Sequence, residues 1–316
     1  IDENALTTYN GKYLIDGSKN GLVEGDRPGK RGTFSTFANM SLATSTDPSD
    51  RLTELKRRDG NSVGIRPSDT ITVSWTKNGV TYTGSFSPIG TRTLNNAIGI
   101  ITNSHASYYR KDAKIGVDVN GEPVYTPKNE PAISIRASKP GVEHQLAGIT
   151  FRVMDNKGHM RNEVNAVLDN FKETVRAQDP SPDNALVLQT GTKANQAVKV
   201  GFTDMRSAAL GLQSYDGKGW DHGTPPSGIS VVGSGSKVQV TTREAANAAI
   251  NVFGNALIKA TDQATLIGTA LERLGYTSSN LVTASENVQD SESVIRDSDM
   301  AKEMTAYTKN NVLTQS

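Results

Sequence analysis

The chain has 316 residues, with 34 Lys and Arg against 33 Asp and Glu, a formal net charge of +1. This balance offers no single-sign excess to attract nucleic acid or an anionic membrane, and no apolar run reaches the roughly 18 residues of a membrane-spanning helix. The sequence contains no cysteine, which excludes disulfide scaffolds, zinc–thiolate sites and thiol nucleophiles. Only 35 % of residues are apolar, a share suited to thin rods and small β-domains.

After a short extended segment at residues 1–20, the block from 21 to 182 has a period of two. Apolar and polar residues alternate on both sides of Asn78-Gly79, which predicts a hairpin. A second hairpin is predicted at Asn120-Gly121, a short helix at 93–98, and further strands at 133–135 and 149–153. The block is therefore predicted to be a β-rich unit, whose expected core residues are Trp75, Phe86, Ile98, Phe151 and Phe171.

The end of this block and the segment after it carry helix and loop patterns. Apolar residues from Val164 to Val175 lie at helical spacing and predict one amphipathic helix. The run Asp179-Pro180-Ser181-Pro182-Asp183 has the composition of a linker. Residues 213–237 are rich in Gly, Ser and Pro and predict a surface loop.

From Thr241 the period becomes 3.5, which predicts one continuous helix over 241–295 that packs against partner helices. Thr241 and Glu244 have the spacing of a capping box at its start. The rod-packing seam comprises Ile250, Phe253, Leu257, Ile267, Leu271, Leu274, Leu281, Val288 and Ile295. Past Ile295 the register slips at Asp297-Ser298-Asp299, which predicts a joint before a second helical segment.

The sequence predicts no catalytic, cofactor-binding or metal site. The four histidines, His105, His144, His159 and His222, lie at no helical or strand spacing from one another. Asp297 and Asp299 form a carboxylate pair, but we expect them to start the next helix, whose amino end favours negative charge. The protein is therefore expected not to be an enzyme.

Three segments carry a family resemblance. Residues 293–304 read SVIRDSDMAKEM, residues 9–18 read YNGKYLIDGS, and residues 188–191 with 202–212 read LQTG and FTDMRSAALGL. They resemble, respectively, the carboxy-terminal helix, the NGKKLLDGS stretch and the β-hairpin of bacterial flagellins, and they occur along the chain in the family's order. The residues that match the family motif are Asn10, Gly11, Asp16, Arg296, Asp297, Asp299 and Met300.

The resemblance implies an α+β multidomain fold, with a long-helix rod core, a β-hairpin and an inserted β-rich α+β outer domain. The discontinuous core would comprise 1–20 and 183–316, and the variable outer domain 21–182. Flagellins have further helical regions before and after these segments, so we interpret the chain as a fragment that lacks both.

The implied function is that of a structural subunit of the bacterial flagellar filament, secreted to the extracellular flagellum for swimming motility. The implied partners are other flagellin subunits, a flagellar export chaperone and hook-associated proteins, with a host innate receptor for the full-length protein and neither nucleic acid nor membrane insertion. Two alternatives stay open. One is a hook–filament junction protein, and the other is a surface adhesin or glycan-binding protein that uses the inserted domain.

Overall fold

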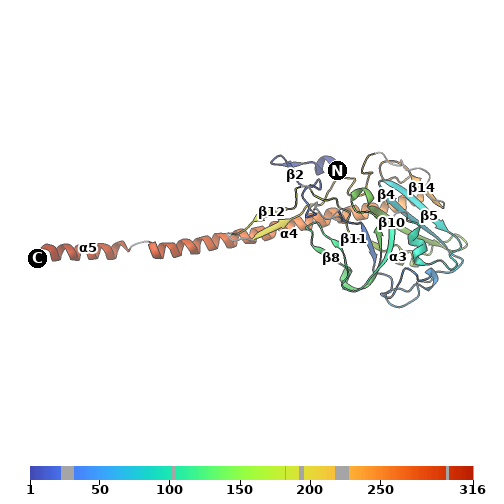
Figure 1. Cartoon of the computed structure of the whole chain (residues 1–316), viewed down its shortest axis with the longest axis horizontal. Helices are drawn as coiled ribbons and strands as arrows, with labels where there is room; N and C mark the ends of the chain where they lie inside the picture. The colour runs from blue at the N-terminus through green and yellow to red at the C-terminus, as the bar shows by residue number, and fades with distance from the viewer. Residues whose placement is uncertain are drawn as a thin grey trace. The chain divides into compact units, whose positions relative to one another are not determined.

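The computed structural model describes residues 1–22, 32–101, 104–181, 183–191, 196–217, 228–296 and 299–315 (Figure 1). The chain divides into two compact units. Unit 1 comprises Ile1–Val187 and Lys199–Leu266, and unit 2 comprises Leu188–Val198 and Ile267–Ser316. The predicted division into a core (1–20 and 183–316) and an outer domain (21–182) differs from these two units and stays a prediction.

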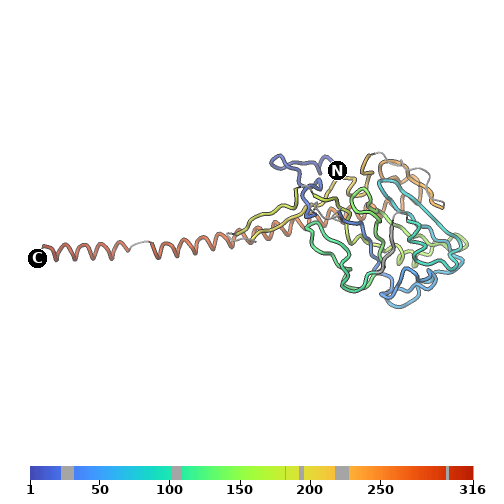
Figure 2. The backbone as a smooth tube through the Cα atoms, viewed as in Figure 1, coloured from blue at the N-terminus to red at the C-terminus, as the bar shows by residue number. Residues whose placement is uncertain are grey.

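The first sheet of unit 1 is antiparallel, with strand order β10-β4-β5-β14. Its strands are β4 (Thr70–Lys77), β5 (Val80–Phe86), β10 (Leu146–Met154) and β14 (Ile229–Gly233). Strands β4 and β5 form the predicted hairpin, because Asn78 and Gly79 take up the left-handed backbone, with φ of 54° and 74°, that this tight turn requires. Strand β14 returns beside β5 from far along the sequence (Figure 2).

The second sheet, with strand order β11-β3-β9-β6, contributes to the same core. Its strands are β3 (Thr36–Asn39), β6 (Ser104–Tyr109), β9 (Ala132–Ala137) and β11 (Phe171–Val175). One hydrophobic cluster draws on both sheets, and the rings of Phe151 and Phe171 lie 5.4 Å apart across it. The predicted core residues Trp75, Ile98, Phe151 and Phe171 are buried, and Phe86 packs partly buried against them.

Short elements complete unit 1. The helices are α1 (Asp2–Ala5), α2 (Leu94–Gly99) and α3 (Asn162–Leu168), with 3₁₀ turns η1 (Leu52–Glu54), η2 (Pro127–Asn129) and η3 (Val142–His144). The two-stranded hairpins are β1 (Thr8–Tyr9) with β2 (Lys12–Tyr13) and β7 (Lys114–Val117) with β8 (Pro123–Tyr125). Thr93 caps α2 through a capping box with Asn96, so this predicted short helix is confirmed.

Helix α4 (Arg243–Arg296) is continuous over 54 residues, as predicted, and its first part belongs to unit 1. The buried side chains there are Ala245, Ala248, Ala249, Val252, Ala256, Lys259 and Gln263. The close approach to β10 requires a glycine, because a Cβ on Gly148 (φ +60°) would lie 2.4 Å from the Ala248 carbonyl oxygen. Small residues therefore let the helix and the sheet meet.

Polar side chains hold the same contact in place. The Asn251 Nδ2 donates to the Ile149 carbonyl and to the Thr150 hydroxyl, both at 3.0 Å. Arg152 and Glu244 form an ion pair at 3.0 Å. The start of this helix was predicted wrongly, because the hydroxyl of Thr242, and not that of Thr241, accepts the Ala245 amide.

Unit 2 contains the turn-proximal part of hairpin β12 (Leu186–Gln189) and β13 (Ala197–Val200), the second part of α4, and α5 (Met300–Gln315). Helix α4 ends at Arg296 and α5 begins at Met300, which confirms the predicted joint between two helical segments. Asp297 and Ser298 lie outside the described residues.

Two predictions of local structure in unit 1 were wrong. The helix expected over 164–175 ends at Leu168, and Phe171–Val175 form strand β11, whose Lys172 pairs with Ala38 of β3. The loop expected over 213–237 contains strand β14. In both places hydrogen bonding to an existing strand overrides the local composition.

Candidate assembly surface

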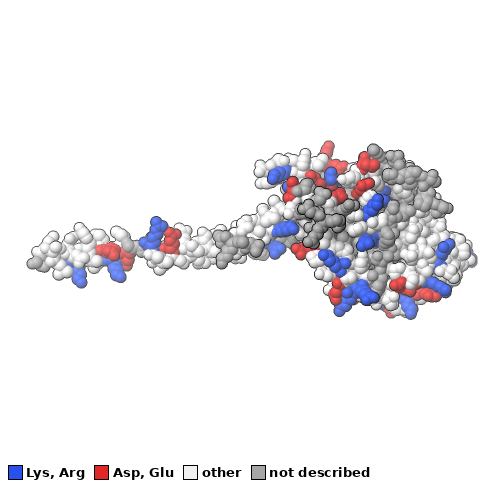
Figure 3. All heavy atoms as spheres, in the orientation of Figure 1, with Lys and Arg blue, Asp and Glu red and all other residues white. Residues whose placement is uncertain are grey.

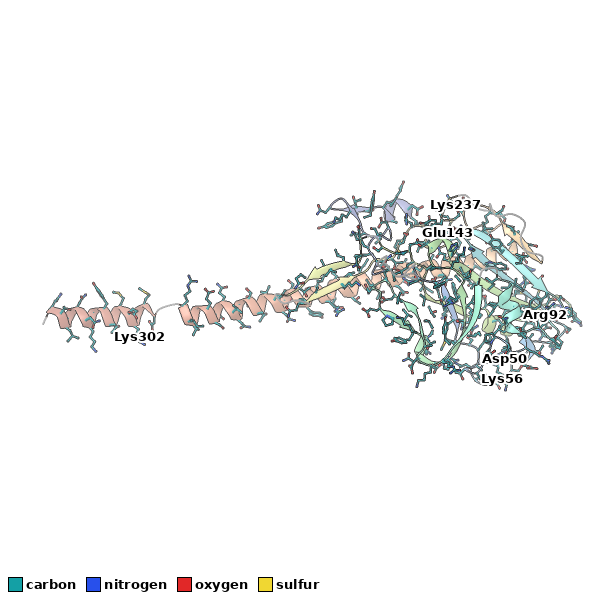
Figure 4. The ribbon with its side chains drawn as sticks, viewed as in Figure 1. Asp50, Lys56, Arg92, Glu143, Lys237 and Lys302 are labelled. Atoms are coloured by element: carbon teal, nitrogen blue, oxygen red, sulfur yellow. The ribbon has the colours of Figure 1, made fainter. Side chains whose placement is uncertain are left out.

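The second part of α4 and all of α5 expose large apolar side chains. Along α4 from residue 267 onward, the exposed set is Ile267, Leu271, Tyr276, Leu281, Val282, Val288, Val294 and Ile295. In α5 it is Met300, Met304, Tyr307, Val312 and Leu313. Figure 4 shows the side chains of α5, with Lys302 labelled, pointing away from the helix. An apolar row of this length on one unit is typical of a surface that binds another protein.

The predicted rod-packing seam lies on this exposed surface. Eight of its nine members are at least 40 % exposed, and Leu274 is half-buried. Ile250, Phe253 and Leu257 are exposed in unit 1, and the remaining members follow in unit 2. Within the single chain most of the seam is therefore uncovered along both parts of the helix, and its role in packing stays a prediction.

The face of α4 that unit 1 buries is a second stripe, which the sequence analysis missed. It runs through Ala245, Ala249, Val252, Ala256, Lys259 and Gln263. These residues alternate by four and three, the same signal as the seam and shifted by one position. Alanine, lysine and glutamine gave it too little hydrophobicity to be recognised.

One small groove in unit 2 combines the hairpin with the helix. Gln189 and Thr190 line it from the hairpin, and six residues line it from α4. The helix residues are Leu274, Thr277, Ser278, Leu281, Val282 and Ser285. The hairpin thus lies beside part of the seam near Leu274, which is half-buried.

The family-motif residues at the joint have defined helix-terminal roles. The carboxylate of Asp299 accepts the amides of Ala301 and Lys302, both at 3.1 Å, so Asp299 caps α5 as expected. Arg296 forms an exposed i,i+4 ion pair with Glu292 at 2.8 Å at the end of α4. Met300 begins α5 and is exposed, whereas Asp297 lies outside the described residues.

The remaining motif residues belong to unit 1. Asn10 and Gly11, with φ of 52° and 72°, form the turn between β1 and β2. The carboxylate of Asp16 accepts both the amide and the hydroxyl of Ser18, which closes a tight turn. These residues shape the backbone of the amino-terminal segment.

On the face seen in Figure 3, basic and acidic side chains are interspersed over the described residues. Among those residues no three His, Cys, Asp or Glu side chains gather as a metal site would require. In the described part of the chain, no helix has the length and apolar character to cross a membrane.

The comparisons with known proteins find flagellins and flagellar filament proteins. Residues 250–316 match the family described as bacterial flagellin C-terminal helical region. Over 318 residues, the chain is 26 % identical to a flagellin of Clostridium tyrobutyricum, covering 100 % of this chain and 64 % of that protein. It is 44 % identical over 89 residues to the flagellar filament 33 kDa core protein of Treponema phagedenis, covering 28 % of this chain and 31 % of that protein.

A shorter relative is covered more fully. The chain is 32 % identical over 137 residues to the putative flagellin YvzB of Bacillus subtilis (strain 168), covering 43 % of this chain and 72 % of that protein. By contrast, the chain spans less than two thirds of the length of the Clostridium and Treponema proteins.

Proposed function

Because the chain belongs to the bacterial flagellin family, we propose that it is a structural subunit of the bacterial flagellar filament. The observation that carries this proposal is the uncovered apolar seam of α4, within the region that matches the family. A filament subunit needs a surface that is buried only after assembly. The relative from Treponema phagedenis is itself named a filament core protein.

A long helix such as α4 depends on packing against other elements for its stability. Isolated helices are marginal in water, and most helical stability in proteins comes from packing of an apolar face. From residue 267 onward the described residues of α4 are exposed or half-buried. Burial of apolar surface contributes about 25 cal/mol per Å². Packing of the seam against helices of neighbouring subunits would therefore supply stability that the single chain lacks.

We propose different roles for the β-rich part and the helical part of the chain. In this proposal residues 21–182 form the variable outer domain, and residues 1–20 with 183–316 form the core that assembles. The proposal is supported by the shared hydrophobic cluster of the two sheets, which gives the β-rich part its own core. Strand β14 pairs with β5, and the first part of α4 packs against β10, so they would link the outer domain to the rod.

The remaining features of the proposal follow from the family. The protein acts outside the cell, in the flagellum, and its partners are other flagellin subunits. The export chaperone, the hook-associated proteins and a host innate receptor are further partners to be tested. The role is structural and not catalytic.

The test is a charge placed on the seam. In cells that lack their own copy of the gene, the gene with Leu271→Asp is expected to give no filaments, because assembly would bury an unpaired carboxylate. The matched control is Thr283→Asp, an exposed position on the opposite face of the helix. Electron microscopy of cells and swimming in soft agar are the readouts.

Thermal unfolding of the purified chain distinguishes a defect in assembly from a defect in folding. Leu271 is 72 % exposed, so Leu271→Asp is expected to leave the thermal unfolding of the purified chain nearly unchanged. Normal filaments from the Leu271→Asp gene would overturn the proposal.

A further inference from the structure

A polar pocket in unit 1 has no part in the proposed assembly. It lies between hairpin β7–β8, strand β11 and helix α4, and has a volume of about 240 Å³. Ligand sites for drug-sized molecules measure roughly 300–1,000 Å³, so this pocket has room for a smaller ligand. Its apolar lining comes from Val117, Val119, Val124, Val175 and Leu266.

Four residues that line the pocket each have a buried side-chain polar atom that lacks a hydrogen-bond partner among the described residues. These atoms are Glu173 Oε1, Gln178 Oε1, Thr203 Oγ1 and Gln263 Nε2. Gln178, Thr203 and Gln263 are each at most 5 % exposed, and the Glu173 side chain is 7 % exposed. Leaving such groups unpaired costs about 1–3 kcal/mol each. A polar ligand that paired with these groups would remove that cost, and all four belong to residues around one pocket.

The donor and acceptor roles of two of these groups are fixed. Gln263 Oε1 accepts the Thr203 amide at 2.9 Å, which leaves Nε2 as a donor. Glu173 Oε2 lies 3.4 Å from the Lys259 ammonium, which is buried, so Oε1 remains as an acceptor. A ligand must therefore both accept and donate hydrogen bonds, and hydroxyl groups do both.

The charges around the pocket are paired within the chain. Arg176 pairs with Asp262 and Lys259 pairs with Glu173. Asp118 Oδ1 accepts the amides of Asn120 and Glu122. A cation would meet the unpaired Gln263 donor, and an anion would meet the Glu173 carboxylate. A neutral molecule fits this lining better than either.

We propose that this pocket binds a small neutral polyhydroxylated ligand of the size of a monosaccharide. Its hydroxyls would donate to Glu173 and Gln178 and accept from Gln263, while its C–H face packs on the valine side chains. Because the pocket combines β11, hairpin β7–β8 and α4, the bound ligand would tie these elements together. The proposal is independent of the filament role and is tested on the free chain.

The test uses isothermal titration calorimetry and saturation-transfer NMR on the full chain, with methyl glycosides of glucose, galactose, mannose and N-acetylglucosamine as probes. Putrescine is the cationic probe. We expect at least one glycoside to bind at millimolar concentration and to raise the unfolding temperature, since a ligand stabilises the state that binds it. We expect putrescine not to bind.

Two variants locate the binding. Thr203→Val and Gln178→Leu are each expected to weaken glycoside binding about tenfold, the equivalent of one hydrogen bond. Thr203→Val is expected to keep or raise the unfolding temperature, because it removes a buried hydroxyl that has no partner among the described residues. Thr72→Val, at a buried threonine of the first sheet, is the matched control and is expected to leave binding unchanged.

Three results would overturn the proposal. They are no binding of any glycoside, binding of putrescine in preference to the glycosides, or glycoside binding that both site variants leave intact. If Thr203→Val does not fold, Gln178→Leu alone decides.

Discussion

Helix α4 is one continuous helix in two different environments. In unit 1 it buries a stripe of small and polar residues, with Val252 fully buried and Lys259 only 3 % exposed. In unit 2 the described residues of the same helix are exposed or half-buried, and Val288 is 68 % exposed. The difference shows that α4 stays helical along its whole length although only its first part is packed against the rest of the chain. The first part is held by its own chain, and the second part leaves its surface largely uncovered within that chain.

The largest effect is expected from a buried charge in the first part. Val252→Asp should lower the free energy of unfolding of unit 1 by several kcal/mol, because the carboxylate would be buried without a partner. Val288→Asp, the same change at an exposed position, should alter it by less than about 0.5 kcal/mol. Urea unfolding followed by circular dichroism and by tryptophan fluorescence measures both. Equal losses of unfolding free energy for Val252→Asp and Val288→Asp would contradict the difference in packing between the two parts of the helix.

The second effect concerns ion pairs in the two parts. Lys259→Met leaves the Glu173 carboxylate buried and unpaired, and should cost about 3–5 kcal/mol. Arg296→Met removes an exposed pair with Glu292 and should cost at most about 1 kcal/mol. Adding Glu173→Leu to Lys259→Met should recover much of the loss in urea unfolding. If it recovers none, the lysine acts through contacts other than this pair.

The third effect is a pH dependence confined to the first part. Burial raises the pKa of Asp169, which lies near Asn251 of α4, to about 6. The unfolded carboxyl ionises more readily, so this group favours folding below its ordinary pKa of 3.8, and that contribution is lost as the pH rises through about 4 to 6. Asp169→Asn should therefore stabilise unit 1 by about 3 kcal/mol at pH 7 and by only about 0.5 kcal/mol at pH 4.

The control for this pH dependence is in the second part of the helix. Asp290 is exposed there, and Asp290→Asn is the matched control variant. Thermal unfolding at the two pH values measures both variants. A parent chain whose pH profile is unchanged by Asp169→Asn would show that this carboxyl is hydrated in solution.

The smallest effect tests the helix backbone itself. Gly275 lies inside α4 with nothing within 4 Å of the position of an added Cβ. Gly275→Ala should therefore stabilise the second part by about 1 kcal/mol, through the helix propensity of alanine. Gly254→Ala makes the same open-space change in the first part and should gain a similar amount. Hydrogen exchange resolved along α4 measures both, and slower exchange near residue 275 is the expected sign.

The candidate surface was partly predictable from sequence. The seam, the break after Ile295 and the cap at Asp299 follow from spacing and residue type, which act within a few turns of one helix. The polar pocket was not predictable. Gln178, Thr203 and Gln263 come from three separate segments of the chain, and only the fold brings them together.

The sequence by itself determined the elements that local chemistry controls. The turn at Asn78-Gly79, the capped helix after Thr93 and the continuous helix α4 depend on backbone preference and short-range periodicity. Tertiary structure decided the rest. Phe171–Val175 became a strand because β3 offers hydrogen bonds, and β14 formed beside β5 in a Gly- and Ser-rich segment. The face of α4 that is buried is the one that packs closely against Gly148, where the Ala248 carbonyl and the Val252 side chain leave no room for a Cβ on the strand.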